Sequence, residues 1–262
     1  MEKLIGQIKA APGVLVLTGA GISVPSGIAP FRGSDPDAVW NRDVTEKGTF
    51  SYFREDVLGS WTWYLGRFAS LFGKQPNPAH DALVKLEEWC HAQHRSFTLI
   101  TQNIDGLHKD AGSQDLFEVH GTARRLRCAT TGCRYGEPHG SVPFPDDLVA
   151  AFRSNPTLEA IPRCVECGDF LRPHVLWFDE YYTAHRDYRF NELPERLRDV
   201  HLILFVGTSF SVGITASVID FAIQNGIPMW TVDPCEPDIS MMNWLEGGAE
   251  VILPQLMAEL QA

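Results

Sequence analysis

The sequence predicts an α/β protein built on a Rossmann-like, doubly wound parallel sheet, with a helical insertion and a smaller cysteine-bearing insert. Three observations predict this class. Short apolar runs alternate with helical patterns, one aromatic-rich stretch shows helical spacing, and four cysteines occur in two close pairs. Strands that alternate with helices are typical of a parallel sheet whose two faces are covered by helices.

Apolar runs along the chain are predicted to form the buried strands of that sheet. They are Val14–Thr18, Phe97–Thr101, His201–Val206, Pro228–Val232 and Glu250–Leu253. Each run has the length of a strand, and helical patterns lie between several of them. We therefore assign residues 1–33, 79–121 and 174–262 to the main domain.

Two stretches interrupt the alternation of strands and helices. Residues 34–78 are rich in aromatic side chains, and their apolar positions recur at helical spacing. These positions are Phe50, Phe53, Val57, Trp61, Tyr64, Phe68 and Leu71. Residues 122–173 contain the paired cysteines and show little apolar periodicity. We predict a helical insertion for the first stretch and a metal-organised small domain for the second.

The cysteine spacing is that of a structural zinc site. Four residues separate Cys128 from Cys133, two separate Cys164 from Cys167, and thirty lie between the pairs. Two such pairs supply four thiolates to one tetrahedral Zn²⁺ and leave no position open for water. The second insert is therefore predicted to be a zinc-ribbon small domain. Cys90 and Cys235 are expected to be packing residues.

Composition and charge narrow the class of protein. The 262 residues carry a formal net charge of -11, which disfavours direct binding to nucleic acid, because that role needs a basic face. Residues 1–10 have the pattern of a short amphipathic helix rather than of a secretion signal. Residues 11–31 lack charge but contain four glycines and three prolines, so no membrane span is expected. Cysteines in close pairs fit metal binding in a reducing, cytoplasmic compartment better than disulfide bonds. We also expect the protein to be a monomer.

Polar residues gather where the predicted strands end. Gly19-Ala-Gly21 follows the first strand, and by itself it is equally compatible with a tight turn. Further polar segments follow in order at Thr101–His108, Val119–Gly121 and Phe205–Ser209. The carboxyl edge of an open α/β sheet is where ligands bind, so these segments predict one shared site.

With these motifs and the four cysteines, the chain resembles the sirtuins, the NAD-dependent protein lysine deacylases, over nearly its whole length. The resemblance implies an NAD-binding Rossmann-like domain, a structural zinc, and acyl-lysine proteins or peptides as substrates. The implied NAD contacts are Gly19, Ala20, Gly21, Ser23, Phe31, Arg32, Gln102, Asn103, Ile104, Asp105, Gly207, Thr208, Ser209 and Asp233.

The resemblance also implies catalytic roles for three residues. Asn103 and Asp105 match the pocket that receives nicotinamide, and His120 matches the general base. A neutral imidazole with a pKa near neutrality suits proton acceptance from a ribose hydroxyl. The expected products are nicotinamide, free lysine and O-acyl-ADP-ribose. The alternative hypothesis is ADP-ribosyl transfer or NAD hydrolysis in the same pocket. A third hypothesis is that the protein is a non-catalytic NAD-sensing or partner-binding module.

The resemblance further implies two groups of substrate contacts. Val175, Trp177 and Phe178 match the segment that pairs with the substrate peptide as an added strand. Tyr64 and Arg67 are three residues apart and would face the same way on a helix. A Tyr-x-x-Arg pair at this place resembles the sirtuin class that removes malonyl, succinyl and glutaryl groups. Without that resemblance, apolar packing of Tyr64 and a solvated Arg67 would be favoured.

Three positions depart from the sirtuin pattern. Asp179 stands where Gly is usual, Ile214 where Pro is usual, and Asp233 where the family presents Asn. The first two changes are expected to alter loop shape. Asp233 can accept hydrogen bonds from ribose hydroxyls, and its charge would repel the 2′-phosphate of NADP.

Overall fold

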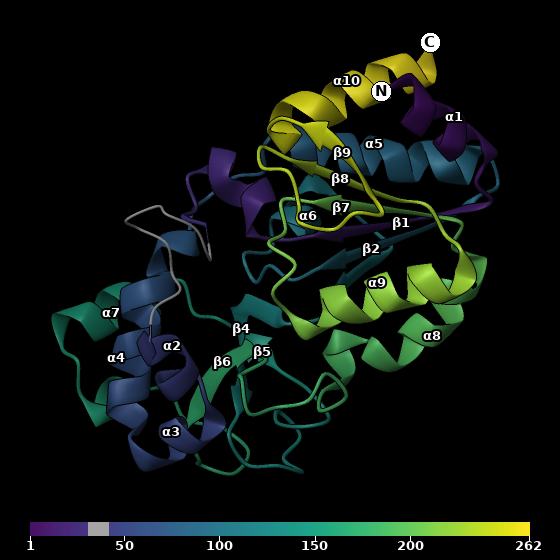
Figure 1. Cartoon of the computed structure of the whole chain (residues 1–262). Helices are drawn as coiled ribbons and strands as arrows, with labels where there is room; N and C mark the ends of the chain where they lie inside the picture. Colours follow the sequence, from purple (N-terminus) through teal and green to yellow (C-terminus); the bar gives the residue numbers. More distant parts are fainter. Residues whose placement is uncertain (31–41) are drawn as a thin grey trace.

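The computed structural model of the chain describes residues 1–30 and 42–262, with the side chains of residues 42 and 43 left aside. Its larger part is a six-stranded parallel sheet in the order β3-β2-β1-β7-β8-β9 (Figure 1). The strands are β1 (Gly13–Thr18), β2 (Ser96–Thr101), β3 (Leu116–Glu118), β7 (Leu202–Val206), β8 (Met229–Asp233) and β9 (Met242–Glu246). The predicted doubly wound parallel sheet is confirmed.

Helices cover both faces of this sheet. On one face lie α1 (Glu2–Ala10), α5 (Pro78–Ala92) and α10 (Ala249–Gln261), whose apolar side chains share a core with β1, β2, β7 and β8. On the other face lie α8 (Leu193–Arg196) and α9 (Gly213–Asn225), whose side chains share a second core. Helix α6 (Leu107–Ala111) follows the end of β2. Strands buried on both faces read as continuous apolar runs, which explains why four of them could be predicted.

The run at Glu250–Leu253, predicted as a strand, is the first part of helix α10 instead. Its apolar residues continue as Leu256, Met257 and Leu260, which are buried together with Leu253 at helical spacing. The strand at this edge of the sheet is β9, whose side chains are half-buried or exposed. A half-buried edge strand lacks the continuous apolar run by which the central strands were predicted.

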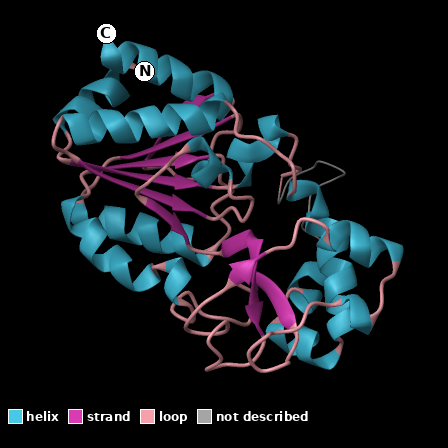
Figure 2. Cartoon of the chain, turned by 180° about the vertical axis from the view of Figure 1, so that it is seen from behind, coloured by secondary structure: helices cyan, strands magenta, loops and turns pink. Residues whose placement is uncertain are grey.

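A smaller module lies at the carboxyl end of the sheet (Figure 2). It contains the antiparallel strands β4 (Gly121–Cys128), β5 (Val142–Pro143) and β6 (Leu171–Val175), in the order β5-β4-β6. Its helices are α2 (Arg42–Lys47), α3 (Phe50–Glu55), α4 (Val57–Phe68) and α7 (Leu148–Ser154). One hydrophobic cluster joins α3 and α4 to the cysteine-bearing segment, so the two inserts of the sequence form a common core.

Local capping explains where the helices begin. The aromatic stripe of the helical insertion breaks at Asp56, whose carboxylate accepts a hydrogen bond from Gly59 N at 2.8 Å and so starts α4. Asn77 caps α5, and His80 Nδ1 accepts a bond from Asn77 N at 3.3 Å. Short 3₁₀ turns complete the chain: η1 (Ala20–Ser26), η2 (Ala69–Leu71), η3 (Leu158–Ala160), η4 (Arg186–Tyr188), η5 (Phe190–Glu192) and η6 (Leu197–Asp199). Among the described residues, no helix has the length and apolar character that a bilayer crossing requires.

Candidate active site and cysteine cluster

A cavity of about 1420 Å³ lies between the carboxyl edge of the large sheet and the smaller module. We call it the main cavity. It is lined by Gly19, Ala20, Gly21, Ser23, Tyr64, Arg67, Gln102, Asn103, Ile104, Asp105, His120, Val175, Trp177, Phe178, Gly207, Thr208, Ser209 and Asp233. These are the predicted nucleotide, catalytic and substrate residues. Phe31 and Arg32, also predicted to contact NAD, lie outside the described residues.

The glycines after β1 are needed because two turns approach each other closely. A Cβ on Gly21 would lie 2.6 Å from Gly207 Cα, and one on Gly19 would lie 2.7 Å from Gly207 O. Gly21 N donates a hydrogen bond to Gly207 O at 2.8 Å. Gly207 itself has a φ of +58°, a backbone conformation that favours glycine. The turns after β1 and β7 are therefore interlocked, and together they form one wall of the cavity.

The polar segment after β2 is locked to the turn after β1. Asn103 Nδ2 donates to Gly19 O at 3.0 Å and to Ser23 Oγ at 3.1 Å. Ser23 Oγ donates to Asp105 Oδ2 at 2.8 Å, and Leu107 N donates to Asp105 Oδ1 at 2.9 Å. Burial raises the pKa of Asp105, and these hydrogen bonds offset only part of that effect. Asn103 and Asp105 thus form a buried, fixed polar corner at the end of β2.

His120 lies between β3 and β4 and presents one ring nitrogen to the cavity. Its Nδ1 is 2.8 Å from Gln102 O, and a carbonyl oxygen can only accept, so Nδ1 carries the proton. Nε2 is then the basic nitrogen, and it lies 3.3 Å from Tyr182 Oη. Burial lowers the pKa of His120, while the bond to Gln102 partly offsets this, so the ring is neutral near pH 7.

Helix α4 supplies another wall of the cavity. Tyr64 is 1% exposed, and its buried hydroxyl has no hydrogen-bond partner among the described residues. Burial raises the pKa of Tyr64, so the hydroxyl stays protonated. One turn later, the Arg67 guanidinium lies 5.8 Å from the centre of the Trp63 ring. A hydroxyl and a guanidinium therefore line the same part of a largely aromatic wall.

The adenosine end predicted from the turn after β7 has an acidic rim. Gln102 Nε2 donates to Thr208 Oγ1 at 3.1 Å, which ties the end of β2 to that turn. Asp233 ends β8, and its Oδ1 accepts a bond from Cys235 N at 2.9 Å. Cys235 is exposed at this rim, so the expectation that it is a packing residue is wrong. Cys90 is fully buried in α5, as expected.

Tyr182 and Trp63 are cavity residues that were not predicted from the sequence. Tyr182 stacks on His120 with ring centres 5.7 Å apart, yet it lies in a segment without regular periodicity. Trp63 follows the apolar stripe of α4 at a position off its main face. Its indole nitrogen is buried without a hydrogen-bond partner within the described part of the chain. Neither residue type carries a spacing signal that would have pointed to the cavity.

The four paired cysteines converge in the smaller module. The Sγ atoms of Cys128, Cys133, Cys164 and Cys167 all lie within 4.8 Å of one another. Cys128 Sγ is 3.4 Å from Cys167 Sγ, and Cys133 Sγ is 3.6 Å from Cys164 Sγ. A tetrahedral Zn²⁺ with bonds of about 2.3 Å requires sulfur separations of about 3.8 Å. The donor set and its spacing therefore fit one structural zinc.

Comparisons with known proteins decide the family. The family model described as "Sir2 family" matches residues 19–213. The chain belongs to the Sir2 family. An "NAD-dependent protein deacylase" of Leptospira interrogans is 34% identical over 252 residues, covering 94% of this chain and 92% of that protein.

Solved structures of Sir2 proteins superpose along the whole chain. The crystal structure of a Sir2 homologue in complex with NAD has a TM-score of 0.79 and 31% identity, and it covers 100% of this chain and 94% of its own. A mutant Sir2 homologue in complex with 2′-O-acetyl ADP ribose has a TM-score of 0.78 and 29% identity, covering 100% and 96%. The sirtuin resemblance of the sequence is thus confirmed, and the chain is an NAD-dependent protein deacylase.

Proposed function

We propose that this sirtuin removes acyl groups from lysine side chains of proteins, consumes NAD, and prefers acyl chains that end in a carboxylate. The observation that carries the preference is the buried hydroxyl of Tyr64, which faces no hydrogen-bond partner among the described residues and shares the main cavity with Arg67. The proposed products are nicotinamide, the free lysine and O-acyl-ADP-ribose.

The nucleotide end of the cavity suits NAD. The interlocked turns after β1 and β7 present backbone groups at the sheet edge where dinucleotides bind. Asn103 and Asp105 form the polar corner proposed to hold nicotinamide. NAD supplies, when bound, an electrophilic ribose carbon from which nicotinamide departs. The charge of Asp233 at the rim favours a ribose with free hydroxyls, so we propose NAD rather than NADP.

His120 is proposed to accept the proton from a ribose hydroxyl. Its Nδ1 proton is held by Gln102 O, so the ring orientation and the basic nitrogen are both fixed. The lowered pKa keeps Nε2 free of a proton at neutral pH. The residue therefore needs no partner to remove a proton before each turnover.

The residues at the acyl end of the cavity support the proposed preference. An acyl chain that ends in a carboxylate carries its charge out of water, which is unfavourable unless the protein supplies partners. A guanidinium and a phenolic hydroxyl are such partners, because both donate to carboxylate oxygens. An acetyl group would leave the buried Tyr64 hydroxyl without a hydrogen-bond partner among the described residues. Sites built this way discriminate by up to about ten-thousand-fold against ligands that lack the matching group.

The test compares acyl groups on one peptide. We expect kcat/KM for succinyl- or glutaryl-lysine peptides to exceed that for the acetyl-lysine peptide, with products identified by mass spectrometry. Arg67→Met should abolish the difference and leave some deacetylation. Arg153→Met, at an exposed position of α7, is the matched control and should keep the wild-type preference.

Four outcomes would contradict parts of the proposal. A wild-type preference for acetyl-lysine, or unchanged desuccinylation by Arg67→Met, removes the acidic-acyl preference. ADP-ribosylated protein or free ADP-ribose as the main product would assign the same NAD pocket to ADP-ribosyl transfer or NAD hydrolysis. Unchanged NAD would mean that the cavity binds the dinucleotide without reaction.

A further inference from the structure

The segment after β6, residues 176–180, lines the main cavity at the place proposed for the substrate peptide. We call it the peptide segment. Leu176 N donates to His120 O at 2.8 Å, so the segment begins beside the catalytic histidine. A peptide added as a strand binds mainly through backbone groups, so the position of this segment determines how well it binds.

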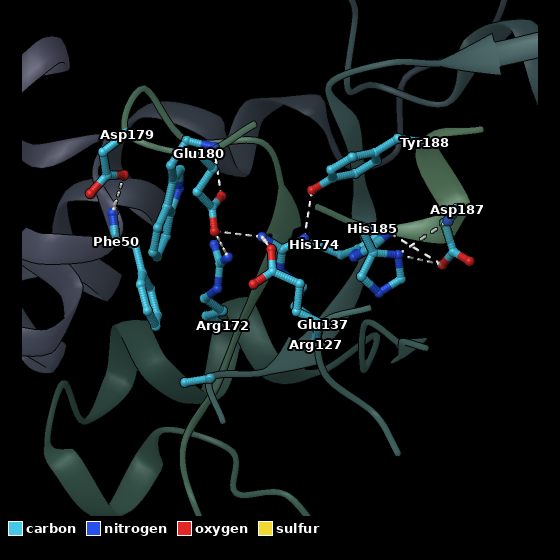
Figure 3. A network of polar contacts seen from close by, with 12 residues as sticks. Phe50, Arg127, Glu137, Arg172, His174, Asp179, Glu180, His185, Asp187 and Tyr188 are labelled. Atoms are coloured by element: carbon cyan, nitrogen blue, oxygen red, sulfur yellow. Dashed lines mark hydrogen bonds and ion pairs between the residues drawn. The ribbon is translucent and has the colours of Figure 1, made fainter. Parts of the chain in front are cut away.

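Glu180 anchors the far end of the peptide segment. Its Oε2 accepts a hydrogen bond from Trp177 N at 2.9 Å. Its Oε1 accepts from Arg127 Nη2 at 2.7 Å and also from Arg172 Nη2. Both arginines are buried in the small sheet, on β4 and β6 (Figure 3). This carboxylate therefore fixes the segment to the small sheet beneath it.

Asp179 makes a second attachment, to the helical insertion. Its Oδ1 accepts from Phe50 N at 2.7 Å (Figure 3). Its Oδ2 accepts from Ser51 N at 3.0 Å and from Ser51 Oγ at 2.9 Å. The preceding residue extends the contact, because Phe178 N donates to Gly48 O at 3.0 Å. The segment is thus bonded to residues about 130 positions earlier in the chain.

The contacts around Phe50 make this attachment firm. The Phe50 ring lies 6.2 Å from the Trp177 ring, and the Arg172 guanidinium lies 4.9 Å from the centre of Phe50. Burial raises the pKa of Asp179, but the bonds from Phe50 and Ser51 outweigh it, so the pKa lies below its ordinary value. The carboxylate is therefore charged throughout the neutral range, and charge strengthens these bonds.

We propose that Asp179 is a positioning residue for the substrate peptide, holding the peptide segment against α3 in the geometry that accepts an added strand. The glycine usual at this position in sirtuins has no carboxylate and could not make this attachment. Ordering the segment before binding lowers the entropy that peptide binding must overcome. The groups proposed for chemistry, Asn103, Asp105 and His120, come from other elements, so Asp179 acts on peptide binding alone.

This inference rests on the proposed deacylation, and its first test is a split between kinetic constants. Asp179→Ala should raise the peptide KM about fivefold or more, since it removes three hydrogen bonds to a charged acceptor. The kcat and the KM for NAD should stay within twofold. The increase should be equal for acetyl- and succinyl-lysine peptides, because the segment contacts the peptide backbone rather than the acyl group.

Two further variants separate positioning from loss of structure. Asp179→Asn keeps one accepting oxygen and should recover part of the peptide KM. Ser51→Ala removes one of the three donors and should raise KM less than Asp179→Ala does. Asp147→Ala, an exposed aspartate at the start of α7 whose side chain makes no capping bond, is the matched control for charge and should leave KM unchanged.

Different results would contradict the proposal for Asp179 and the proposed deacylation. If Asp179→Ala lowers kcat without changing peptide KM, or changes neither constant, Asp179 is not a positioning residue. If wild type turns over no acyl-lysine peptide, the proposed function fails instead. The Kd of a fluorescent acyl-lysine peptide, measured by anisotropy with ADP-ribose present, then decides the role of Asp179. An equal Kd for wild type and Asp179→Ala overturns it, and a Kd raised about fivefold supports it.

Discussion

At the scale of single residues, the tautomer of His120 determines what its ring can do. The carbonyl of Gln102 fixes the proton on Nδ1, which leaves Nε2 as the acceptor facing the cavity. His120→Ala removes this acceptor and should lower the deacylation kcat by roughly a hundred- to ten-thousand-fold. The thermal unfolding midpoint should change little. Near-normal turnover by a folded His120→Ala protein would show that another group accepts the proton.

Tyr182 is a second residue that affects the basic nitrogen of His120, because its hydroxyl lies within hydrogen-bond distance of Nε2. Tyr182 Oη lies 3.3 Å from His120 Nε2, the ring nitrogen that carries no proton. The hydroxyl of Tyr182 is therefore oriented to donate to Nε2, and this bond stabilises the neutral ring.

Tyr182→Phe should consequently raise the pKa of His120. The enzyme needs a neutral ring, so the acid limb of the kcat/KM profile should move to higher pH, by about half a unit for one hydrogen bond. Tyr181→Phe is the matched control, because Tyr181 is 78% exposed. An acid limb at the same pH in both variants would mean that the Tyr182 hydroxyl does not interact with His120.

These residues also show what the sequence could predict about the site. Asn103, Asp105 and His120 follow strands, and strand ends of a parallel sheet meet at one edge, so their convergence could be predicted. Tyr182 reaches His120 through an irregular segment whose path depends on tertiary packing. The attachment by Asp179 was missed for a similar reason. The sequence indicated an altered loop there but not the partners, which lie about 130 positions away.

At the scale of elements, helix α10 and strand β9 show that the periodicity of a short apolar run does not distinguish a helix from a strand. A run of four apolar-rich residues at Glu250–Leu253 has the same local pattern in a buried strand and in a helix. Only the continuation through Leu260 distinguishes them. The aromatic stripe of the insertion was longer, and α3 and α4 form there with a single break at Asp56. Long periodic stretches are therefore predictable, whereas short ones depend on the rest of the sheet.

The small sheet gives a prediction about metal at this scale. The turns that carry Cys128, Cys133, Cys164 and Cys167 share a hydrophobic cluster with α4, which forms the proposed acyl wall. We expect about one zinc per folded chain by metal analysis. Removal by a strong chelator should loosen the turns and raise the KM for acyl peptides, since the metal contributes folding free energy. Readdition of Zn²⁺ should restore the KM.

A single substitution can remove one zinc ligand while the large sheet stays folded. Cys164→Ser should reproduce the effect of chelation on zinc content and KM. Cys235→Ser, at an exposed cysteine outside the cluster, should retain full zinc. Zinc far below one equivalent in well-folded wild-type protein would contradict the assignment of these cysteines as a metal site.

At the scale of the whole molecule, buried histidines couple folding to pH. His80 and His174 are 0% and 1% exposed, and burial lowers the pKa of each to about 4. Their unfolded pKa is about 6.5. Between pH 6.5 and pH 4 the unfolded chain therefore binds more protons than the native protein. The contribution of these two histidines to the free energy of unfolding must therefore decrease as the pH falls through this window.

His174 offers the sharper measurement, because its ring lies 3.3 Å from Asp187 at the side of the small sheet, outside the main cavity (Figure 3). Going from pH 7.5 to pH 5.5 should cost wild type about 1 kcal/mol through this residue, or roughly 2–4 °C in Tm. The asparagine of His174→Asn cannot titrate, so this variant should lose the part of the Tm difference that comes from His174, even if its Tm is lower at both pH values.

Glu118, whose pKa burial raises to about 7, acts in the opposite direction, but it contributes equally to both proteins and cancels in the comparison. His94→Asn is the control, since His94 is exposed at a left-handed backbone position that Asn tolerates. If His174→Asn and His94→Asn show the same Tm difference between the two pH values, protonation of His174 does not oppose folding.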